Sequence, residues 1–201
     1  MKFKIWEMAL MTALAVTMLC GFVWQADGQE MADKMIRIHV VANSDSAEDQ
    51  ALKLSVRDAV LDSLSPVLAG AEDKTAAEKR VEAALEALRQ TAENEVRRQG
   101  YTYTVTAVLT EESFPTRDYD TFSLPAGRYT SLRIVLGAGE GHNWWCVVYP
   151  ALCTAAAVED SEAAETLSPE EIGLITEENT GYVIKFKTIE WMNGLRAFLF
   201  G

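Results

Sequence analysis

The sequence has few of the residues that build metal and nucleophilic sites. Its 201 residues include only three cysteines and two histidines. It contains no G-x-S-x-G elbow, phosphate-binding P-loop, H-E-x-x-H helix or C-x-x-C pair. The presence of only two histidines argues against a multi-histidine zinc site within one chain. The sequence therefore predicts no catalytic set, no metal site and no cofactor, and we expect a protein that is not an enzyme.

Basic residues are also scarce. Eighteen Lys and Arg stand against 30 Asp and Glu, which gives a formal net charge of −12. Nucleic-acid affinity comes mostly from Lys and Arg that neutralise phosphates, so DNA and RNA are not expected as partners. The hydrophobic fraction of 49% with only five prolines is typical of a globular domain rather than of a disordered or collagen-like chain.

The amino terminus has the layout of an export signal. Lys2 and Lys4 precede an uncharged apolar run from Met8 to Trp24. This is typical of a secretory signal or a signal-anchor, whose basic flank stays on the cytoplasmic side. We therefore interpret residues 1–25 as a signal peptide or signal-anchor helix and residues 26–201 as one extracytoplasmic domain. Cleavage and anchoring at the membrane through residues 5–24 both remain open.

Two helices follow the first predicted strand, residues 35–41. Ser46 and Asp49 form a capping-box pattern, and apolar residues then recur at helical spacing until Pro66 and Gly70. Thr75 and Glu78 form a second such pattern, whose helix is expected to end at Gly100.

The apolar period changes to two after Gly100, which predicts strands. They are expected over 101–109, 121–124, 129–136, 143–149 and 182–186, with a terminal amphipathic helix over 189–199. The order of elements predicts an α+β fold. In it, a mostly antiparallel sheet packs against two amphipathic helices and a C-terminal helix, preceded by the N-terminal apolar helix.

The C-terminal third contains an acidic stretch and a pair of cysteines. Residues 151–181 hold eight acids and no Lys or Arg, which suits either a solvated excursion or a docking strip for a basic partner. Cys146 and Cys153 suit a disulfide in an oxidising compartment, provided that the chain reverses near Tyr149-Pro150. Two buried free thiols are the alternative.

Polar residues gather around the end of the first predicted strand. His39, Asn43, Ser44, Asp45 and Asp49 offer three interpretations: a hard-cation site, a partner contact, or a capped helix start whose side chains satisfy backbone N–H groups. His39 itself suits a structural, hydrogen-bonded histidine. The glycine-rich segment 137–141 precedes a β-branched run instead of a helix, so it predicts a strand connection and not a phosphate loop.

The segment 142–146 suggests two further functions. His142 and Cys146 would form a cysteine hydrolase pair only if the chain bends at Asn143, because positions four apart in a strand are roughly 13 Å apart. In an extended strand, Trp144 and Trp145 point to opposite faces, so one of them could anchor a partner. Around a bend, both would pack inward.

Two long segments of the chain carry unusual motifs. The first comprises residues 36–46 (IRIHVVANSDS), 49–53 (DQALK) and 56–61 (VRDAVL). The second comprises residues 124–129 (LPAGRY), 132–134 (LRI), 141–147 (GHNWWCV) and 149–153 (YPALC). Both segments resemble the stage II sporulation protein R family of spore-forming bacteria. Ala151 stands where the family tends to have a second proline, and the acidic stretch 155–180 matches nothing in the family, so we expect it to be variable.

The resemblance implies a signalling protein. Such proteins are made in the forespore and exported into the space between forespore and mother-cell membranes. There they activate a membrane-embedded aspartic-type peptidase, which removes the pro-segment of the mother-cell sigma factor. As contacts with that peptidase we expect residues of the 39–49 and 143–145 segments: His39, Asn43, Ser44, Asp45, Asp49, Asn143, Trp144 and Trp145. The alternatives are an exported cysteine hydrolase and an extracytoplasmic structural or binding module.

Overall fold

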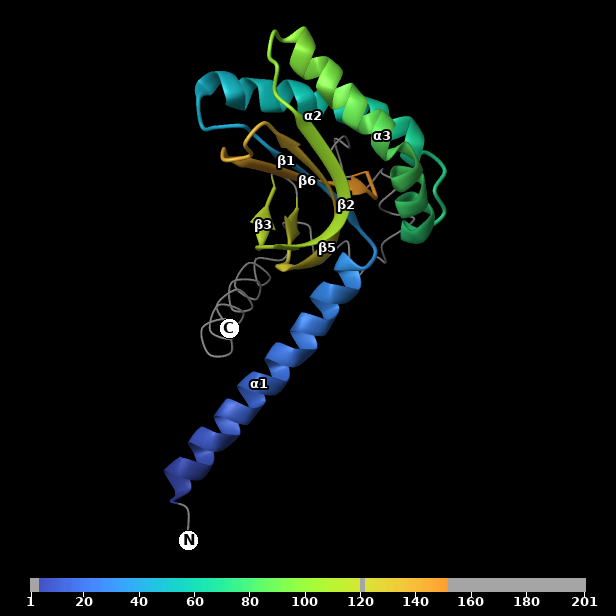
Figure 1. Ribbon diagram of the computed structural model, residues 1–201. Helices are drawn as coiled ribbons and strands as arrows, with labels where there is room; N and C mark the ends of the chain where they lie inside the picture. Colours follow the sequence, from blue (N-terminus) through green and yellow to red (C-terminus); the bar gives the residue numbers. More distant parts are fainter. Residues whose placement is uncertain (1–3, 120–121, 152–201) are drawn as a thin grey trace.

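The computed structural model describes residues 4–119 and 122–151 (Figure 1). The acidic stretch, Cys153, the strand predicted over 182–186 and the helix predicted over 189–199 lie outside the described residues. The fold is α+β, with helices packed on a mixed sheet.

The sheet has four strands in the order β2-β5-β1-β6. These strands are β1 (Ile36–Val41), β2 (Val105–Phe114), β5 (Gly127–Leu136) and β6 (Asn143–Tyr149). β1 runs parallel to β5, whereas β1 with β6 and β2 with β5 are antiparallel. The prediction of a mostly antiparallel sheet is therefore confirmed. Two short strands, β3 (Arg117–Asp118) and β4 (Ser123–Leu124), form a separate antiparallel pair.

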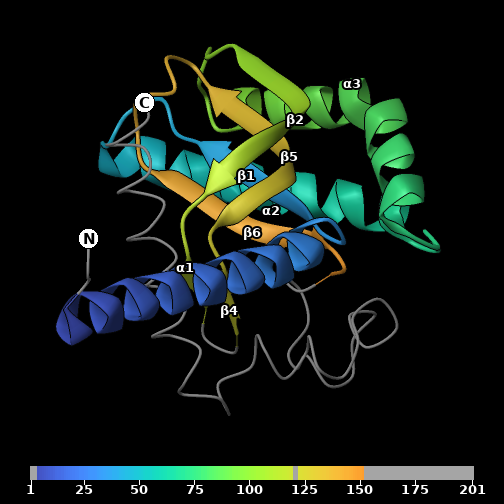
Figure 2. The ribbon, with the colours of Figure 1, turned by 90° about the horizontal axis from the view of Figure 1, so that it is seen from below.

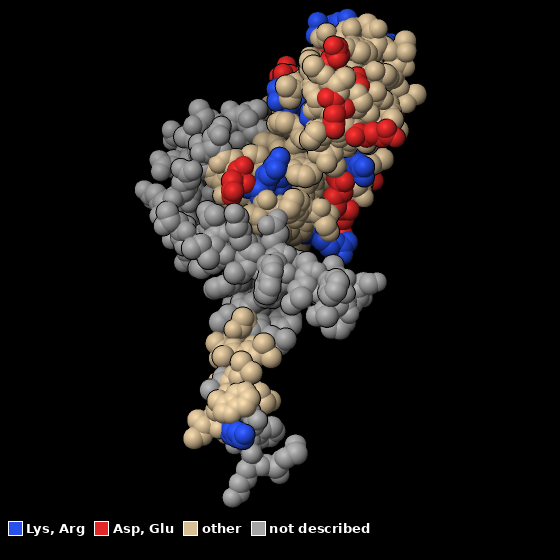
Figure 3. Space-filling model, turned by 90° about the vertical axis from the view of Figure 1, so that its left-hand side faces the viewer, with Lys and Arg blue, Asp and Glu red and all other residues tan. Residues whose placement is uncertain are grey.

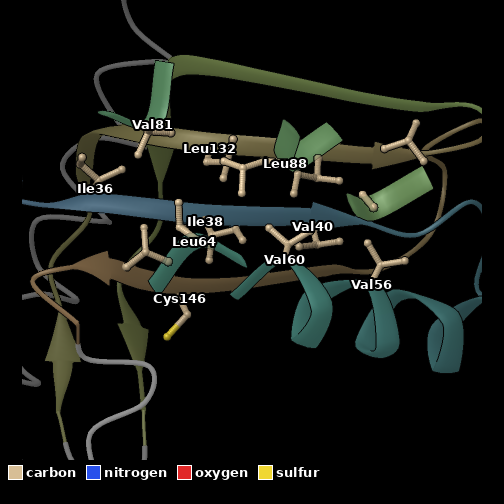
Figure 4. Packing of buried hydrophobic residues seen from close by; sticks show 14 of the residues in the cluster. Ile36, Ile38, Val40, Val56, Val60, Leu64, Val81, Leu88, Leu132 and Cys146 are labelled. Atoms are coloured by element: carbon tan, nitrogen blue, oxygen red, sulfur yellow. The ribbon is translucent and has the colours of Figure 1, made fainter. Parts of the chain in front are cut away.

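Helices α2 (Ala47–Leu68) and α3 (Lys74–Arg98) cover one face of the sheet (Figure 1). The apolar side chains predicted from helical spacing are the ones buried against it. Figure 4 shows Val56, Val60 and Leu64 of α2 pointing at Ile38 and Val40 of β1. This core forms because β1 presents Ile36, Ile38 and Val40 on one face, as the two-residue period of a strand requires.

The helix boundaries differ from the predicted ones at two points. Asp73 caps α3, with its side chain accepting a hydrogen bond from the backbone N–H of Ala76, so Thr75 lies inside the helix. Pro66 lies within α2, which ends only at Leu68. A proline this close to the end removes one backbone donor, and the final turn continues because Leu64 and Leu68 are both buried in the core.

The strand predicted over 101–109 begins later and extends further. β2 starts at Val105, while Tyr101 and Tyr103 lie before it with ring centroids 5.3 Å apart and pack against the core. Phe114 lies beyond the predicted end of this strand, yet it is the last residue of β2, where it pairs with Gly127 and is buried. Apolar alternation weakens after Leu109, so the sequence pattern did not reveal the polar half of this strand.

A second cluster of buried side chains covers part of the opposite face of the sheet. It lies on the side away from α2 and α3, where α1 (Ile5–Ala32) and the β3–β4 pair are found (Figures 1 and 2). Its members come from the end of α1, the sheet and the segment around β4: Met31, Ala32, Met35, Phe114, Phe122, Leu124, Tyr129 and Val147. β1 is consequently buried along its whole length.

The first half of α1 projects from the domain (Figure 1). Its apolar side chains are exposed: Ile5, Trp6, Met8, Leu10, Met11, Leu14 and Val16. Figure 3 shows this mostly uncharged projection below a domain surface on which acidic and basic side chains are interspersed. Among the described residues, no helix has the combined length and hydrophobicity needed to cross a membrane.

Candidate functional site

The two sequence motifs meet in space at one end of the sheet. We call this region the motif corner: residues 42–49, which join β1 to α2, and residues 137–143, which join β5 to β6. The backbone N–H of Gly141 donates to the carbonyl of Ala42 at 3.0 Å, and that of Glu140 donates to the carbonyl of Asn43 at 3.2 Å. Segments far apart in the chain are therefore fixed to one another.

The side chains of Asn43 and Asp49 make hydrogen bonds within the motif corner. Asn43 accepts from the backbone N–H of Ala138 at 2.9 Å through Oδ1, and donates through Nδ2 to Asp49 at 2.9 Å. The Ser44 hydroxyl also donates to Asp49, at 2.6 Å. These hydrogen bonds, with that from Ser44 the strongest influence, hold the pKa of Asp49 below its usual range. The turn from Asn43 to Asp49 therefore has the geometry of a helix start that is stabilised by side-chain hydrogen bonds.

The predicted helix cap at Ser46 is present, but only in one direction. The Ser46 hydroxyl accepts from the backbone N–H of Asp49 at 3.1 Å. The Asp49 carboxylate turns toward Asn43 and Ser44 instead of completing the reciprocal half of the capping box. Its pairing with the preceding turn joins α2 to the end of β1.

The glycine-rich segment is a strand connection, as predicted. It links β5 to β6, and Gly137 and Gly139 adopt positive φ angles of 57° and 67°. The close approach of the Ser44 backbone requires glycine at position 141, because a Cβ there would lie 2.2 Å from the carbonyl oxygen of Ser44. The glycines thus allow the connection to pack against the turn after β1.

The exposed rim of the motif corner carries Asp45 and His142. The side chain of Asp45 is 54% exposed and that of His142 is 77% exposed. The Asp45 carboxylate accepts from the backbone N–H of His142 at 2.6 Å and contacts its imidazole. Beneath them the buried Lys53 donates to the carbonyl of His142 at 3.0 Å, and burial lowers the pKa of this lysine.

A second group of polar side chains lies on the sheet face opposite α2 and α3. We call it the polar sheet face and define it by Arg37, His39, Glu112, Ser131, Arg133, Asn143 and Trp145. In it, the His39 ring lies between two partners. Its Nδ1 is 3.1 Å from the Glu112 carboxylate, and its Nε2 is 2.9 Å from Oδ1 of Asn143. Glu112 also pairs with Arg133 at 3.4 Å.

Arg37 is fully buried in this face, next to His39 on β1. Its guanidinium donates to the Tyr119 hydroxyl at 2.7 Å and lies 4.1 Å from the centroid of the Phe114 ring and 5.0 Å from that of Tyr129. Burial lowers the pKa of Arg37. Aromatic faces thus stabilise a cation in a place where water is excluded.

Trp144 and Trp145 point to opposite faces of β6, as expected for an extended strand. Trp144 packs against the helix-side core and lies under Arg57, whose guanidinium carbon is 4.9 Å from the ring centroid. Trp145 belongs to the polar sheet face. Its ring centroid is 5.7 Å from that of His39, and the guanidinium carbon of Arg117 lies 4.9 Å from the Trp145 ring centroid. Both indoles are half-buried.

The geometry does not support a Cys146–His142 hydrolase pair. Cys146 is buried and disulfide-bonded, so it has no free thiol, while His142 is exposed and paired with Asp45. The proposed bend at Asn143 is absent because Asn143 is the first residue of β6. The pairing of Cys146 with Cys153 in particular stays a prediction. Among the described residues, no three His, Cys, Asp or Glu side chains converge as metal ligands.

Arg37, Glu112, Ser131 and Arg133 were not predicted as site residues. Arg37 alternates with buried isoleucines, and this alternation is also typical of a strand whose other face meets solvent. Glu112 lay beyond the expected end of its strand. The pairing of Arg37 with Ser131 and of His39 with Arg133 depends on the parallel register of β1 and β5, which local patterns do not specify.

Comparison with known proteins decides the family. The profile described as Stage II sporulation protein R (spore_II_R) matches residues 32–159. The chain belongs to the stage II sporulation protein R family. A member from Bacillus subtilis (strain 168), "Stage II sporulation protein R", is 31% identical over 183 residues, covering 81% of this chain and 82% of that protein. No solved structure matches. Family membership places the protein in sporulation, and both segments of the motif corner lie within the matched region.

Proposed function

We propose that this protein is an exported signal of sporulation that activates a membrane-embedded aspartic-type peptidase. The forespore exports it into the space between the two membranes. There its folded domain binds the outward face of the peptidase in the mother-cell membrane and favours the active state. The peptidase then removes the pro-segment of the mother-cell sigma factor. The observation that carries this proposal is the family match over residues 32–159.

Two features of the chain support export. Lys2 and Lys4 precede the apolar run, and the large apolar side chains described in the first half of α1 are exposed. Such a helix is recognised by the export machinery, and its removal or retention decides whether the domain stays at the membrane.

The contact residues that we propose are the exposed members of the predicted set. Asp45 lies on the rim of the motif corner, while Asn143 belongs to both the motif corner and the polar sheet face and is also exposed. Asn43, Ser44 and Asp49 hold the rim in place from within. A shift of the peptidase from 1% to 99% active would need about 5.5 kcal/mol of preferential binding, which a few well-placed side chains can supply.

A reconstituted processing assay tests the proposal. This chain, the candidate peptidase and the pro-sigma factor are co-expressed in a host that does not sporulate, and the size of the sigma factor is followed on a blot. We expect the shortened sigma factor only when this chain is present and exported. The matched control lacks residues 1–24 and so keeps the folded region inside the cytoplasm.

Other outcomes would contradict the proposal. Processing that is equal with and without the chain would remove the activator function. Processing by the control that lacks residues 1–24 would remove the requirement for export. Absence of processing with all three proteins present and folded would favour an extracytoplasmic structural module.

A further inference from the structure

The polar sheet face contains buried donors that lack acceptors. In the described part of the chain, five buried side-chain atoms have no hydrogen-bond partner, and all belong to this face. They are Nε and Nη1 of Arg37, Nε of Arg133, Nε1 of Trp145 and Oγ of Ser131. Four of the five are N–H groups, which can only donate. Buried polar groups are normally paired, so these unpaired donors show that the face has more donors than acceptor oxygens.

The strand register brings these donors together. Arg37 pairs with Ser131 across β1 and β5, and His39 pairs with Arg133 on one side and Trp145 on the other. Residues paired in this way project from the same face of a sheet. The donors therefore occupy two adjacent rows across β5, β1 and β6.

The same face is locally positive in an acidic protein. Arg37, Arg133 and Arg117, which lies over Trp145, contribute three guanidinium groups. Among the residues that define this face, Glu112 is the one carboxylate, and it contacts both His39 and Arg133. The chain as a whole has a net charge of −12, so this concentration of arginine runs against its composition.

Part of this face is open. Beside Arg133, the edge strand β2 exposes Thr106, Val108 and Thr110, and Val108 is 45% exposed. The side chain of Arg133 is 43% exposed even though its Nε is buried. Arg117 and Asn143 are exposed as well. A ligand can therefore reach the outer arginines from solvent, while the buried row behind them stays shielded.

We propose that the open part of the polar sheet face binds an extended acidic segment on the outward side of the peptidase. This inference rests on the proposed function and names the contact. Carboxylates of the segment pair with Arg117 and Arg133, and its backbone carbonyls lie over the threonines of β2. The charges are complementary, because the exposed guanidinium groups of Arg117 and Arg133 attract carboxylates. The planar, forked guanidinium is also the side chain best suited to a carboxylate.

A direct binding measurement tests the surface without the peptidase. The probe is a fluorescein-labelled hexaglutamate peptide, followed by anisotropy with the purified full chain at low salt. We expect salt-sensitive binding that weakens at least tenfold in Arg117→Glu and in Arg133→Gln. Arg128→Glu is the matched control, because Arg128 is exposed on β5 and pairs with Glu111 away from this face. Circular dichroism checks that each variant is folded.

Three results would overturn the inference: no binding of the peptide, equal loss in Arg128→Glu, or undiminished binding in both Arg117→Glu and Arg133→Gln. Vesicles of phosphatidylglycerol and phosphatidylcholine form a second arm. If vesicles bind through these arginines and hexaglutamate does not, the face recognises lipid and not an acidic segment.

The processing assay then separates this inference from the proposed function. We expect at least tenfold less processing with Arg117→Glu, full processing with Arg128→Glu, and recovery when one outward acid of the peptidase is changed to lysine. Full processing by Arg117→Glu and by Arg133→Gln would place the contact elsewhere while leaving the activator function standing. Absence of processing with the wild-type chain would contradict the proposed function, whatever the peptide binds.

Discussion

The side-chain amide of Asn43 donates a hydrogen bond of 2.9 Å to the carboxylate of Asp49. This contact joins the residue that follows β1 to the first turn of α2. It also shows why a loss of activity in variants of the motif need not reveal a contact with a partner. Substitutions here disturb the position of the whole rim, including Asp45 and His142.

Asp49→Ala should destabilise the domain. The carboxylate is buried and accepts from both Asn43 and Ser44, so its removal leaves two donors without their acceptor. We expect the free energy of unfolding in urea to fall by about 2 kcal/mol, the usual scale for hydrogen bonds to a charged group. Glu82→Ala on the exposed side of α3 is the control and should change it by less than about 0.5 kcal/mol. Equal effects of the two variants would contradict the assigned role.

The contribution of Asp49 should depend on pH in the acid range. Its pKa in the folded state is lowered, chiefly by the hydrogen bond from Ser44, whereas in the unfolded chain it is about 3.9. A lowered carboxyl pKa stabilises the fold above the unfolded value, and this stabilisation is lost as the pH falls through the folded value. The difference in unfolding free energy between wild type and Asp49→Asn should therefore be constant from about pH 7 to pH 5. Below about pH 4 it should shrink, and a difference that grew there would contradict the assignment.

Gly141→Ala should be among the costly substitutions in the motif. The added Cβ would meet the Ser44 carbonyl oxygen at 2.2 Å, and that atom belongs to backbone already fixed by hydrogen bonds. We expect a loss of about 3 kcal/mol in unfolding free energy, the upper range for overpacking. Gly100→Asn gives the comparison, because Gly100 has a positive φ but open space around its Cα, so asparagine should cost less than about 1 kcal/mol. Similar midpoints in a thermal melt of the two variants would argue against the close approach.

Two neighbouring glutamates on β2 should behave differently. Glu112 is largely buried beside His39 and Arg133, whereas Glu111 is exposed and pairs with Arg128 at the surface. Glu112→Ala leaves a histidine and an arginine without their acceptor, and we expect a loss of about 2 kcal/mol in urea unfolding. Glu111→Ala should cost less than about 1 kcal/mol, as surface ion pairs usually do. The reverse order would show that the polar sheet face is not held by Glu112.

The sequence predicted the parts of the fold that depend on local chemistry. The apolar periods of Val56, Val60 and Leu64 and the termination of α3 near Gly100 are properties of short segments, and the structure agrees. The placement of Asp73 as the cap was missed because Thr75 and Glu78 offered an equally good pattern two residues later. Both patterns are locally sound, and the structure uses Asp73.

The polar sheet face could not be predicted in the same way. Arg37, Glu112 and Arg133 come from three strands, and their meeting depends on the register of non-consecutive strands. No short-range signal distinguishes a strand arginine that faces solvent from one enclosed by Phe114 and Tyr129. The Asn43–Asp49 contact could have been predicted from the sequence, because both residues belong to the same turn and helix start.

The end of α1 is built into the domain that it precedes. Gln29 exchanges hydrogen bonds with the backbone of Arg128 at 3.1 and 3.4 Å, and Met31 and Ala32 are buried in the second cluster. Helix α1 is continuous up to these contacts, so no flexible linker separates the apolar segment from the sheet. A cut before Gln29 would leave all these contacts in the released domain, whereas a cut after Met31 would remove this side chain from the interior. In an uncut chain, the continuous helix α1 would fix the orientation of the domain relative to the apolar segment.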